Sequence, residues 1–395
     1  MSKLPALLGG EPAFMVKVPI VRPVLPDLTE LADGIQSILS TGMITKGKYL
    51  EAFESAVAQH LGVKHAVAVS SCTSGLMLTY RSLRLSGEVV VPSFTFMATV
   101  SALEWSGLRP VFTDVDAETT NLDPVAAEQA ITPQTTAIVA VHNFGNPADI
   151  DALQSLANRY GIKLVFDAAH GFGALYQGQP VGAQADAQVF SLSPTKLLIT
   201  GEGGIVATND DTLAAQIRLG REYGNNGSYD SVFAGLNARM PEFNALVGLR
   251  SLERLEDAAN SRNATAAIYH AGLGCLPGIG FQEVRPGDRN SYKDFSITVD
   301  TGAFGLSRDE LALALAAENI DTRKYYAPPV HRQAAYSHYY SGQPLPSTDW
   351  LALNSLSFPI WSFMPADAAI KICEIVQRIQ ENASAVQHKL ASNGK

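Results

Sequence analysis

The chain is poor in cysteine and in long apolar runs, and both shortages exclude classes of protein. Its 395 residues include only three cysteines, Cys72, Cys275 and Cys373, which lie far apart in the sequence. Neither a disulfide framework nor a zinc site is therefore indicated, no metal is expected, and a reducing cytoplasm suits such a chain best. We find no internal repeat and no low-complexity tract.

The sequence also has no expected membrane-spanning segment, no expected secretion signal and no excess of basic residues. The uncharged stretch 89–103 is interrupted by proline and hydroxyl residues and is too short to cross a bilayer. The opening MSKLPALLGGEPAF has no sustained apolar run of the kind a signal peptide needs. With 29 Lys and Arg against 38 Asp and Glu, the formal net charge is −9. We therefore expect neither nucleic acid nor a membrane as the main partner.

What the sequence does contain is a regular alternation of apolar strands and amphipathic helices. Short apolar runs such as HAVAVS and KLVFDAA are separated by helical patterns, which predicts a mainly parallel sheet with helices on both faces. From about Pro241 a long helical pattern leads into a region with its own strand, DFSITVD. The length favours one large domain, residues 1–255 with the N-terminal segment included, and a smaller C-terminal domain, residues 256–395.

Two residues in the first region carry distinctive chemistry. Asp167 follows the apolar LVF, at the carboxyl end of an expected strand, where open α/β sheets bind their ligands. Lys196 lies between a Ser/Thr/Pro turn and a Gly-rich turn. A lysine amine can anchor an aldehyde cofactor as an imine, and a carboxylate beside a pyridine nitrogen keeps the ring protonated and electron-withdrawing. A solvated lysine and a helix-capping aspartate are the plainer readings of each residue alone, but together they match pyridoxal phosphate (PLP) chemistry.

These motifs resemble the DegT/StrS family of PLP-dependent sugar aminotransferases. The family's D-A-A-[HQ] tetrapeptide corresponds to Asp167–His170, its F-S-x-x-P-x-K stretch to Phe190–Lys196, and its G-E-G-G turn to Gly201–Gly204. The resemblance extends over most of the chain. It implies an α/β protein with the PLP-dependent transferase fold of type I, in which a large domain with a mainly parallel central sheet between helices is joined to a smaller C-terminal α/β domain. Lys196 would hold the cofactor covalently.

The resemblance also implies which residues surround the cofactor. The turn SSCTSGL opens a helix, a common place for an anion, although an ordinary Ser/Thr cap is the alternative. In this turn Cys72 replaces the family's usual glycine. Because cysteine disfavours a positive φ, the sequence leaves the backbone geometry of this turn open. The resemblance implies that Thr73, Ser74 and Ser191 contact the cofactor phosphate and that Phe96 stacks on the ring face. It also implies that Asp167 contacts the ring nitrogen and His170 the ring oxygen. Either Phe94 or Phe96 could instead belong to the core.

Two further segments resemble parts of the family that reach the substrate or the partner. GLNARM corresponds to a motif whose asparagine, here Asn237, contacts the cofactor phosphate of the neighbouring subunit, which implies a homodimer with shared active sites. The segment TRKYYAPPVHRQAAY corresponds to a substrate-side segment, in which Arg323, Tyr325, Tyr326 and His331 are candidates for substrate contact. A solvated surface cluster is the alternative for this segment.

The expected reaction is transfer of an amino group from glutamate or glutamine to a keto group of a nucleotide-linked sugar. An aminocyclitol aminotransferase that uses a keto-inositol is an alternative, because LLGGEPAF resembles the start of some such enzymes. A sugar dehydratase on the same scaffold is disfavoured because that group replaces the anchoring lysine with histidine. A non-catalytic scaffold is disfavoured because both Asp167 and Lys196 are present. The aminated carbon, the nucleotide, the donor and any assembly beyond a dimer are left open by the sequence.

Overall fold

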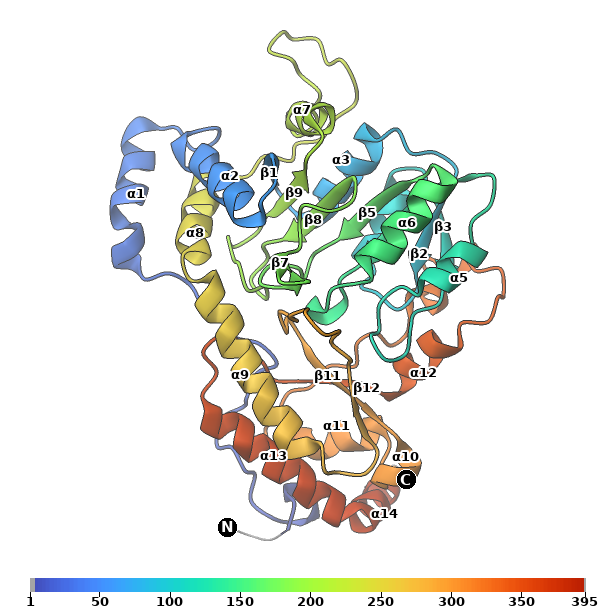
Figure 1. Ribbon diagram of the computed structural model, residues 1–395. Helices are drawn as coiled ribbons and strands as arrows, with labels where there is room; N and C mark the ends of the chain where they lie inside the picture. The colour runs from blue at the N-terminus through green and yellow to red at the C-terminus, as the bar shows by residue number, and fades with distance from the viewer. Residues whose placement is uncertain (1–3, 394–395) are drawn as a thin grey trace.

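The structure, a computed structural model, describes residues 4–393 and consists of a large domain and a smaller C-terminal domain. Helix α9 (Leu255–Leu273) runs from one domain into the other, as Figure 1 shows. It follows α8 (Glu242–Leu252) after a short break, so the long helical pattern expected from Pro241 is divided into two helices.

A seven-stranded sheet forms the centre of the large domain, in the order β1-β9-β8-β5-β4-β2-β3. Strand β9 is antiparallel to both of its neighbours, and the other adjacent strands are parallel. The expected mainly parallel sheet is therefore confirmed. The strands are β1 (His65–Val69), β2 (Glu88–Pro92), β3 (Arg109–Thr113), β4 (Thr135–Val141), β5 (Lys163–Asp167), β8 (Ala187–Ser191) and β9 (Gly204–Thr208).

Helices cover both faces of this sheet because its strands are apolar on both sides, as expected of a parallel sheet. One face packs against α2 (Lys48–Leu61), α5 (Pro124–Gln129), α6 (Ile150–Tyr160) and α8. The other face packs against α3 (Cys72–Ser82), α4 (Ala98–Trp105) and α7 (Asp211–Gly220). A small hairpin, β6 (Leu175–Tyr176) with β7 (Gln179–Pro180), follows β5.

Helix α1 (Leu28–Thr41) has a side-chain cap at its start and a glycine at its end. Asp27 and Glu30 form a capping box at its start, and Gly42 ends it with a φ of 68°. Glycine adopts this left-handed conformation without the strain that a side chain adds. The helix packs against α8 and extends from the side of the large domain (Figure 1).

The C-terminal domain has a three-stranded antiparallel sheet of β10 (Ile279–Phe281), β11 (Phe295–Val299) and β12 (Ser355–Phe358). Its apolar core lies between this sheet and several helices. These are α9, α10 (Thr301–Phe304), α11 (Arg308–Ala317), α13 (Ala366–Glu381) and α14 (Ala383–Asn393), while α12 (Pro346–Asn354) lies toward the large domain.

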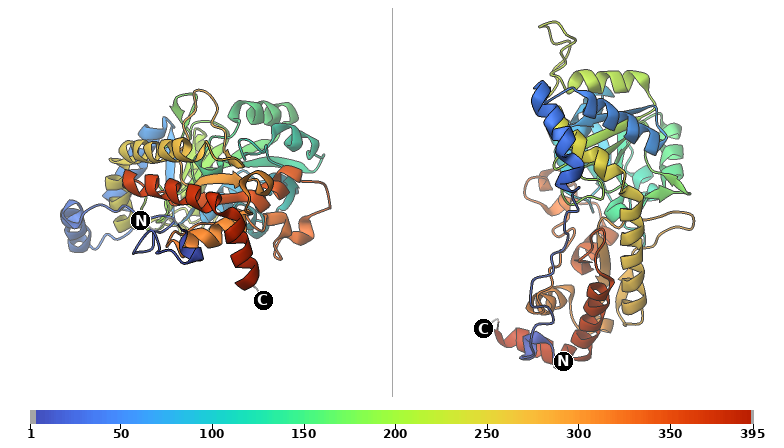
Figure 2. Two further views of the ribbon diagram at one scale, coloured as in Figure 1. Left: turned by 90° about the horizontal axis from the view of Figure 1, so that it is seen from below. Right: turned by 90° about the vertical axis from the view of Figure 1, so that its left-hand side faces the viewer.

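The N-terminal segment packs on the C-terminal domain, which differs from the expected grouping of residues 1–255. Val18 pairs with Ile320 and is buried in the core of the small domain, and the helical turn η1 (Ala6–Leu8) contacts α14. Figure 2 shows this segment running along the small domain. A short segment without a core of its own gains burial and backbone hydrogen bonds by joining an existing domain.

A segment of the expected C-terminal domain, residues 330–345, likewise packs on the other domain, the large one. Val330, Tyr336 and Leu345 are buried in the hydrophobic cluster formed by α3, α4 and the central sheet. The two domains are therefore linked at several places besides α9.

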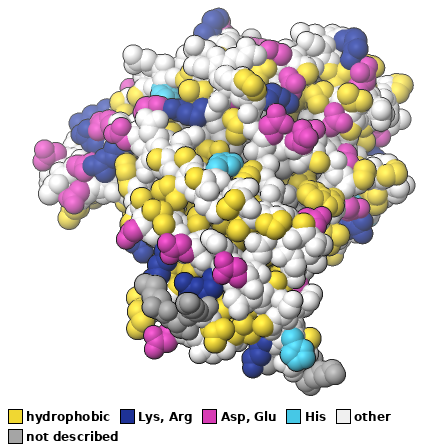
Figure 3. Space-filling model, turned by 60° about the horizontal axis from the view of Figure 1, so that its bottom comes forward, with side chains coloured by type: hydrophobic (Ala, Val, Ile, Leu, Met, Phe, Trp, Pro, Cys, Tyr) yellow, Lys and Arg dark blue, Asp and Glu magenta, His cyan; other side chains and the backbone are white. Residues whose placement is uncertain are grey.

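None of the helices within residues 4–393 is both long enough and apolar enough to cross a bilayer. On the face shown in Figure 3, basic side chains are scattered among acidic ones and form no continuous basic field.

Candidate active site

A cavity of about 390 Å³ opens at the carboxyl ends of the parallel strands. Val141 at the end of β4, Asp167 at the end of β5 and Ser191 at the end of β8 line it. The N-terminus of α3 closes one side, and residues of the C-terminal domain close the other. The position agrees with the general placement of ligands in open α/β sheets.

Asp167 lies deep in this cavity, and only 5% of the residue is exposed. The Thr99 hydroxyl donates a hydrogen bond of 2.7 Å to its Oδ2, and the Ala169 N–H donates one of 3.1 Å to its Oδ1. Burial raises the pKa of Asp167, while these donors and the positive charge of Lys196 oppose that rise. The carboxylate is thus prepared to pair with a cation that enters the cavity.

Lys196 lies in the same cavity, on the turn between β8 and β9. Its N–H donates to the Ser193 carbonyl at 3.0 Å, which fixes the turn. Burial, followed by the positive charge of Lys293, lowers the pKa of Lys196 to about 7. A large share of this amine is therefore neutral and nucleophilic near neutral pH.

His170 borders the cavity with an unsatisfied ring nitrogen. Its Nδ1 is buried and has no hydrogen-bond partner within the described part of the chain. Burial and the positive charge of Lys196 lower its pKa well below the usual value, so the ring is neutral. A buried ring nitrogen without a partner is the kind of group that a bound cofactor can satisfy.

The N-terminus of α3 presents small hydroxyl residues to the cavity. Ser71 and Thr73 line it, whereas Ser74 lies in the capping box with Ser71, whose hydroxyl accepts the Ser74 N–H at 3.1 Å. Cys72 has no positive φ, so the glycine usual at this position is not required here. Its thiol lies 3.7 Å from Asp167 Oδ1.

Of the two phenylalanines between β2 and α4, one lines the cavity and the other belongs to the core. Phe96 lines the cavity and is half exposed, whereas Phe94 is buried in a separate cluster with Phe144 and Tyr326. A flat apolar ring beside Lys196 and Asp167 can hold an aromatic cofactor by dispersion.

Besides Ser74, three residues expected at the site lie outside this cavity. Asn237 is exposed and pairs with Glu222 through the backbone. Arg323 is exposed and donates to the carbonyl of Thr322.

His331 is buried, and its Nδ1 lies 2.7 Å from the Ser93 hydroxyl. Its Nε2 lies 3.5 Å from Asp349, so the ring links the large domain to α12. Of the four candidates for substrate contact, Tyr325 and Tyr326 line the cavity. His142 is fully buried, and burial lowers its pKa to about 4, as expected of a structural histidine.

Several lining residues were not found from the sequence. They are Ser71, Thr95, Glu202, Lys293 and Asp294, and Thr99 supports Asp167 from behind. Lys293 precedes the expected strand DFSITVD and Asp294 begins it, and a pair of charges at a strand start could have indicated them. Their approach to the large domain, however, depends on how the domains pack.

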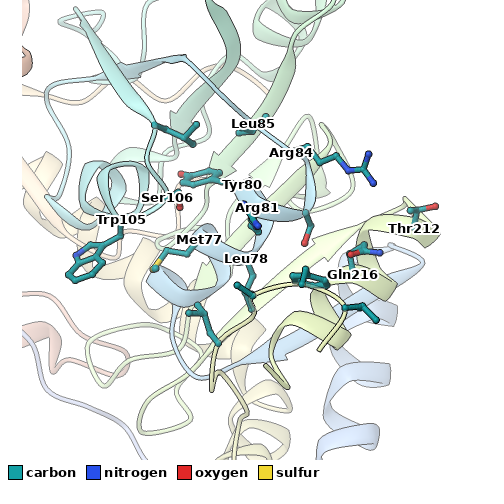
Figure 4. Close-up of a pocket in the computed structure, with 16 residues that line it drawn as sticks. Met77, Leu78, Tyr80, Arg81, Arg84, Leu85, Trp105, Ser106, Thr212 and Gln216 are labelled. Atoms are coloured by element: carbon teal, nitrogen blue, oxygen red, sulfur yellow. The ribbon is translucent and has the colours of Figure 1, made fainter. Parts of the chain in front are cut away.

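A second hollow, of about 880 Å³, lies on the other end of α3 (Figure 4). Tyr80, Arg81, Trp105 and Gln216 contribute to its wall, and no lysine or carboxylate lines it among the described residues. It therefore lacks the groups that would hold an aldehyde cofactor.

The residues of the smaller cavity fit PLP. A carboxylate lies at its depth, a lysine of lowered pKa and an aromatic ring line it, and small hydroxyl residues stand at a helix N-terminus where a phosphate is stabilised. The unsatisfied nitrogen of His170 completes the set.

Comparison with known proteins agrees with this geometry. The profile of the DegT/DnrJ/EryC1/StrS aminotransferase family matches residues 28–377. The chain is 36% identical over 351 residues to a dTDP-3-amino-3,4,6-trideoxy-alpha-D-glucose transaminase from Streptomyces venezuelae, covering 88% of this chain and 91% of that protein.

Solved structures lead to the same conclusion. DesI, solved in the presence of its TDP-sugar product, superposes with a TM-score of 0.91 at 35% identity, over 99% of both chains. DesV of S. venezuelae, solved with a ketimine intermediate, superposes with a TM-score of 0.86 at 35% identity, over 93% of this chain and 99% of that one. The expected fold is thereby confirmed, and the chain belongs to the DegT/DnrJ/EryC1/StrS aminotransferase family and is a transaminase.

Proposed function

We propose that this enzyme uses PLP to move an amino group from glutamate or glutamine to a keto group of a nucleotide-linked sugar. The observation that carries the proposal is the joint placement of Lys196 and Asp167 in one cavity, where burial and a neighbouring cation lower the pKa of the lysine to about 7. The relatives add the substrate class, because two of them are named for dTDP- or TDP-linked sugars.

When bound, PLP supplies an aldehyde that exchanges between amines and a ring that accepts electrons. Asp167 would pair with the ring nitrogen, and Phe96 would hold the ring plane and exclude water. Ser71, Thr73 and Ser191 would donate hydrogen bonds to the phosphate.

Lys196 has two uses in this scheme. Its neutral amine would first hold the cofactor, and after the donor displaces it, Nζ would take the proton from the substrate α-carbon. The lowered pKa suits both uses, since a general base works best when its pKa lies near the working pH.

We further propose that the active enzyme is a homodimer in which Asn237 completes the site of the partner. Asn237 is exposed outside the cavity of its own chain and pairs through the backbone with Glu222. The loop between these two residues, 223–236, projects beyond α7 (Figure 1). Tyr229 in that loop is fully exposed, and Trp105 beside the larger hollow is 76% exposed. Exposed aromatic groups of this kind are common at protein interfaces.

The alternative acceptor, a keto-cyclitol, is not favoured by the relatives, which act on or were solved with sugar nucleotides. The test is the absorbance spectrum of the PLP-loaded protein. We expect a yellow form that is bleached by glutamate or glutamine and restored by a dTDP-linked keto-sugar. Restoration by a keto-inositol and not by the sugar nucleotide would contradict the proposed acceptor.

A further inference from the structure

A second lysine lines the cavity that contains Lys196. Lys293 lies two residues before β11, and 8% of its side chain is exposed. Its ammonium lies 2.9 and 3.0 Å from the two carboxylate oxygens of Asp294, whose side chain is 7% exposed. Buried ion pairs contribute little net stability, because desolvation offsets their attraction. Stability alone therefore does not account for this pair in a reaction cavity.

The backbone that carries Lys293 is held from two sides. The fully buried Arg262 donates to the carbonyls of Tyr292 and Lys293 at 3.1 Å each. The Ser291 hydroxyl donates to the carbonyl of His170 at 2.8 Å, which ties this segment to the large domain beside the cavity. Lys293 is thus fixed at the place where the small domain meets the candidate cofactor site.

The ammonium of Lys293 retains capacity for another anion. It has three N–H donors, and within the described chain its hydrogen bonds go to Asp294 alone. The ring of Tyr325 lies 5.6 Å from Nζ, and Tyr325 also lines the cavity. A ligand carboxylate that enters the cavity can therefore share this cation with Asp294.

We propose that Lys293 binds the α-carboxylate of the amino-acid donor, and that Asp294 is the counterion that remains when the donor leaves. The inference rests on the proposed transamination. The α-carboxylate is attached to the carbon that carries the transferred amine, so it must arrive close to Lys196. The diphosphate of a nucleotide-linked sugar is separated from a keto carbon by part of the sugar ring, and it reaches such a position less well.

The ion pair of Lys293 and Asp294 also suits a site that binds two substrates of different charge in turn. One cavity must bind a charged amino acid and then a sugar whose reacting end is neutral. A lone buried cation would be unpaired in the second state, at a high cost in desolvation. Asp294 prevents this, since Lys293 keeps a counterion whichever substrate is present.

The charge of Lys293 acts on the neighbouring lysine as well. It is the largest electrostatic contribution that lowers the pKa of Lys196. A donor carboxylate that balances Lys293 would reduce this effect, so Lys196 would hold a proton more readily once the donor has arrived.

The test measures binding of 2-methylglutamate and 2-methylglutamine to the PLP-loaded enzyme by calorimetry. These probes lack the hydrogen on Cα and therefore bind without being transaminated. The double variant Lys293→Gln/Asp294→Asn removes both charges and leaves no unpaired ion, whereas Lys293→Arg keeps the cation. Lys17→Gln is the matched control, because Lys17 pairs with Asp321 at 2.7 Å on the surface of the same domain.

We expect the double variant to bind the better probe at least about tenfold more weakly. Lys293→Arg should stay within about threefold of the wild type and Lys17→Gln should match it, with PLP content unchanged in every variant. Equal probe binding by the wild type and the double variant would overturn the inference. Weaker binding of dTDP, with the probe unaffected, would assign Lys293 to the nucleotide instead. A wild type that binds neither probe would overturn the donor class in the proposed function as well.

Discussion

At the scale of single residues, the chemistry depends on how burial changes two ionisable groups. Burial lowers the pKa of Lys196 to about 7 and raises the pKa of Asp167. Burial disfavours the charged forms of both groups, and a cationic cofactor ring would reverse the effect on Asp167. The site is therefore electrostatically complementary to a group that brings its own positive charge.

The lowered pKa of Lys196 has a direct kinetic consequence. Only the neutral amine attacks an aldehyde, and the neutral fraction falls as the pH drops below the pKa. We predict that the rate at which the apoenzyme captures PLP is nearly constant above about pH 8 and falls roughly tenfold per pH unit well below about 7. Stopped-flow absorbance measures this rate, and a rate that keeps rising up to about pH 10 would show an ordinary lysine.

Thr99 provides a second prediction, because its hydroxyl donates to Asp167 Oδ2 at 2.7 Å and lowers the pKa of that carboxyl. In Thr99→Val this donor is lost, the pKa rises, and the carboxylate is protonated over a higher pH range. We expect kcat to fall about tenfold or more, with the acidic limb of the pH profile moved upward. Thr99→Ser should restore both, while an unchanged profile in Thr99→Val would remove Thr99 from the account.

At the scale of elements, the site depends on close contact between α3 and the antiparallel strand β9. A Cβ added to Gly204 at the start of β9 would lie 2.6 Å from the Ser71 carbonyl carbon and 2.7 Å from the Cys72 nitrogen. These are backbone atoms and cannot move without moving the N-terminus of α3. The glycine of the G-E-G-G motif therefore has a packing role.

We predict that Gly204→Ala lowers the free energy of unfolding by about 1–3 kcal/mol and weakens PLP binding, because it displaces the helix N-terminus. Gly302→Ala is the control, since its nearest neighbour is the Asp300 carboxylate at 3.3 Å, away from the site. Thermal unfolding and PLP titration measure the two effects. Normal PLP affinity in Gly204→Ala would separate α3 from phosphate binding.

The sequence predicted these elements well where the signal was local. The alternation of strands and helices and the turn around Lys196 both depend on neighbouring residues. It did not show that Lys293 lines the same cavity as Lys196, because the two lie in different domains and meet only through packing. For the same reason it grouped the N-terminal segment with the large domain, although Val18 is buried in the small one.

At the scale of the whole molecule, the proposed homodimer divides each site between two chains. Lys196 would act in its own chain and Asn237 in that of the partner. We predict that Lys196→Ala and Asn237→Ala are each poorly active alone. Mixed and reassociated, they should recover about a quarter of wild-type activity, because half of the dimers are mixed and each of these has one intact site. No recovery in dimers shown to be mixed would contradict sharing of the site.

The most direct test of the central claim is to identify the lysine that holds the cofactor. Two lysines, the partly exposed Lys196 and the buried Lys293, line the cavity that we assign to PLP. Borohydride reduction of the PLP-loaded enzyme, followed by peptide mass mapping, separates them. The account predicts a pyridoxyl group on Lys196 alone and its loss in Lys196→Ala. A group on Lys293, or one that persists in that variant, would contradict it.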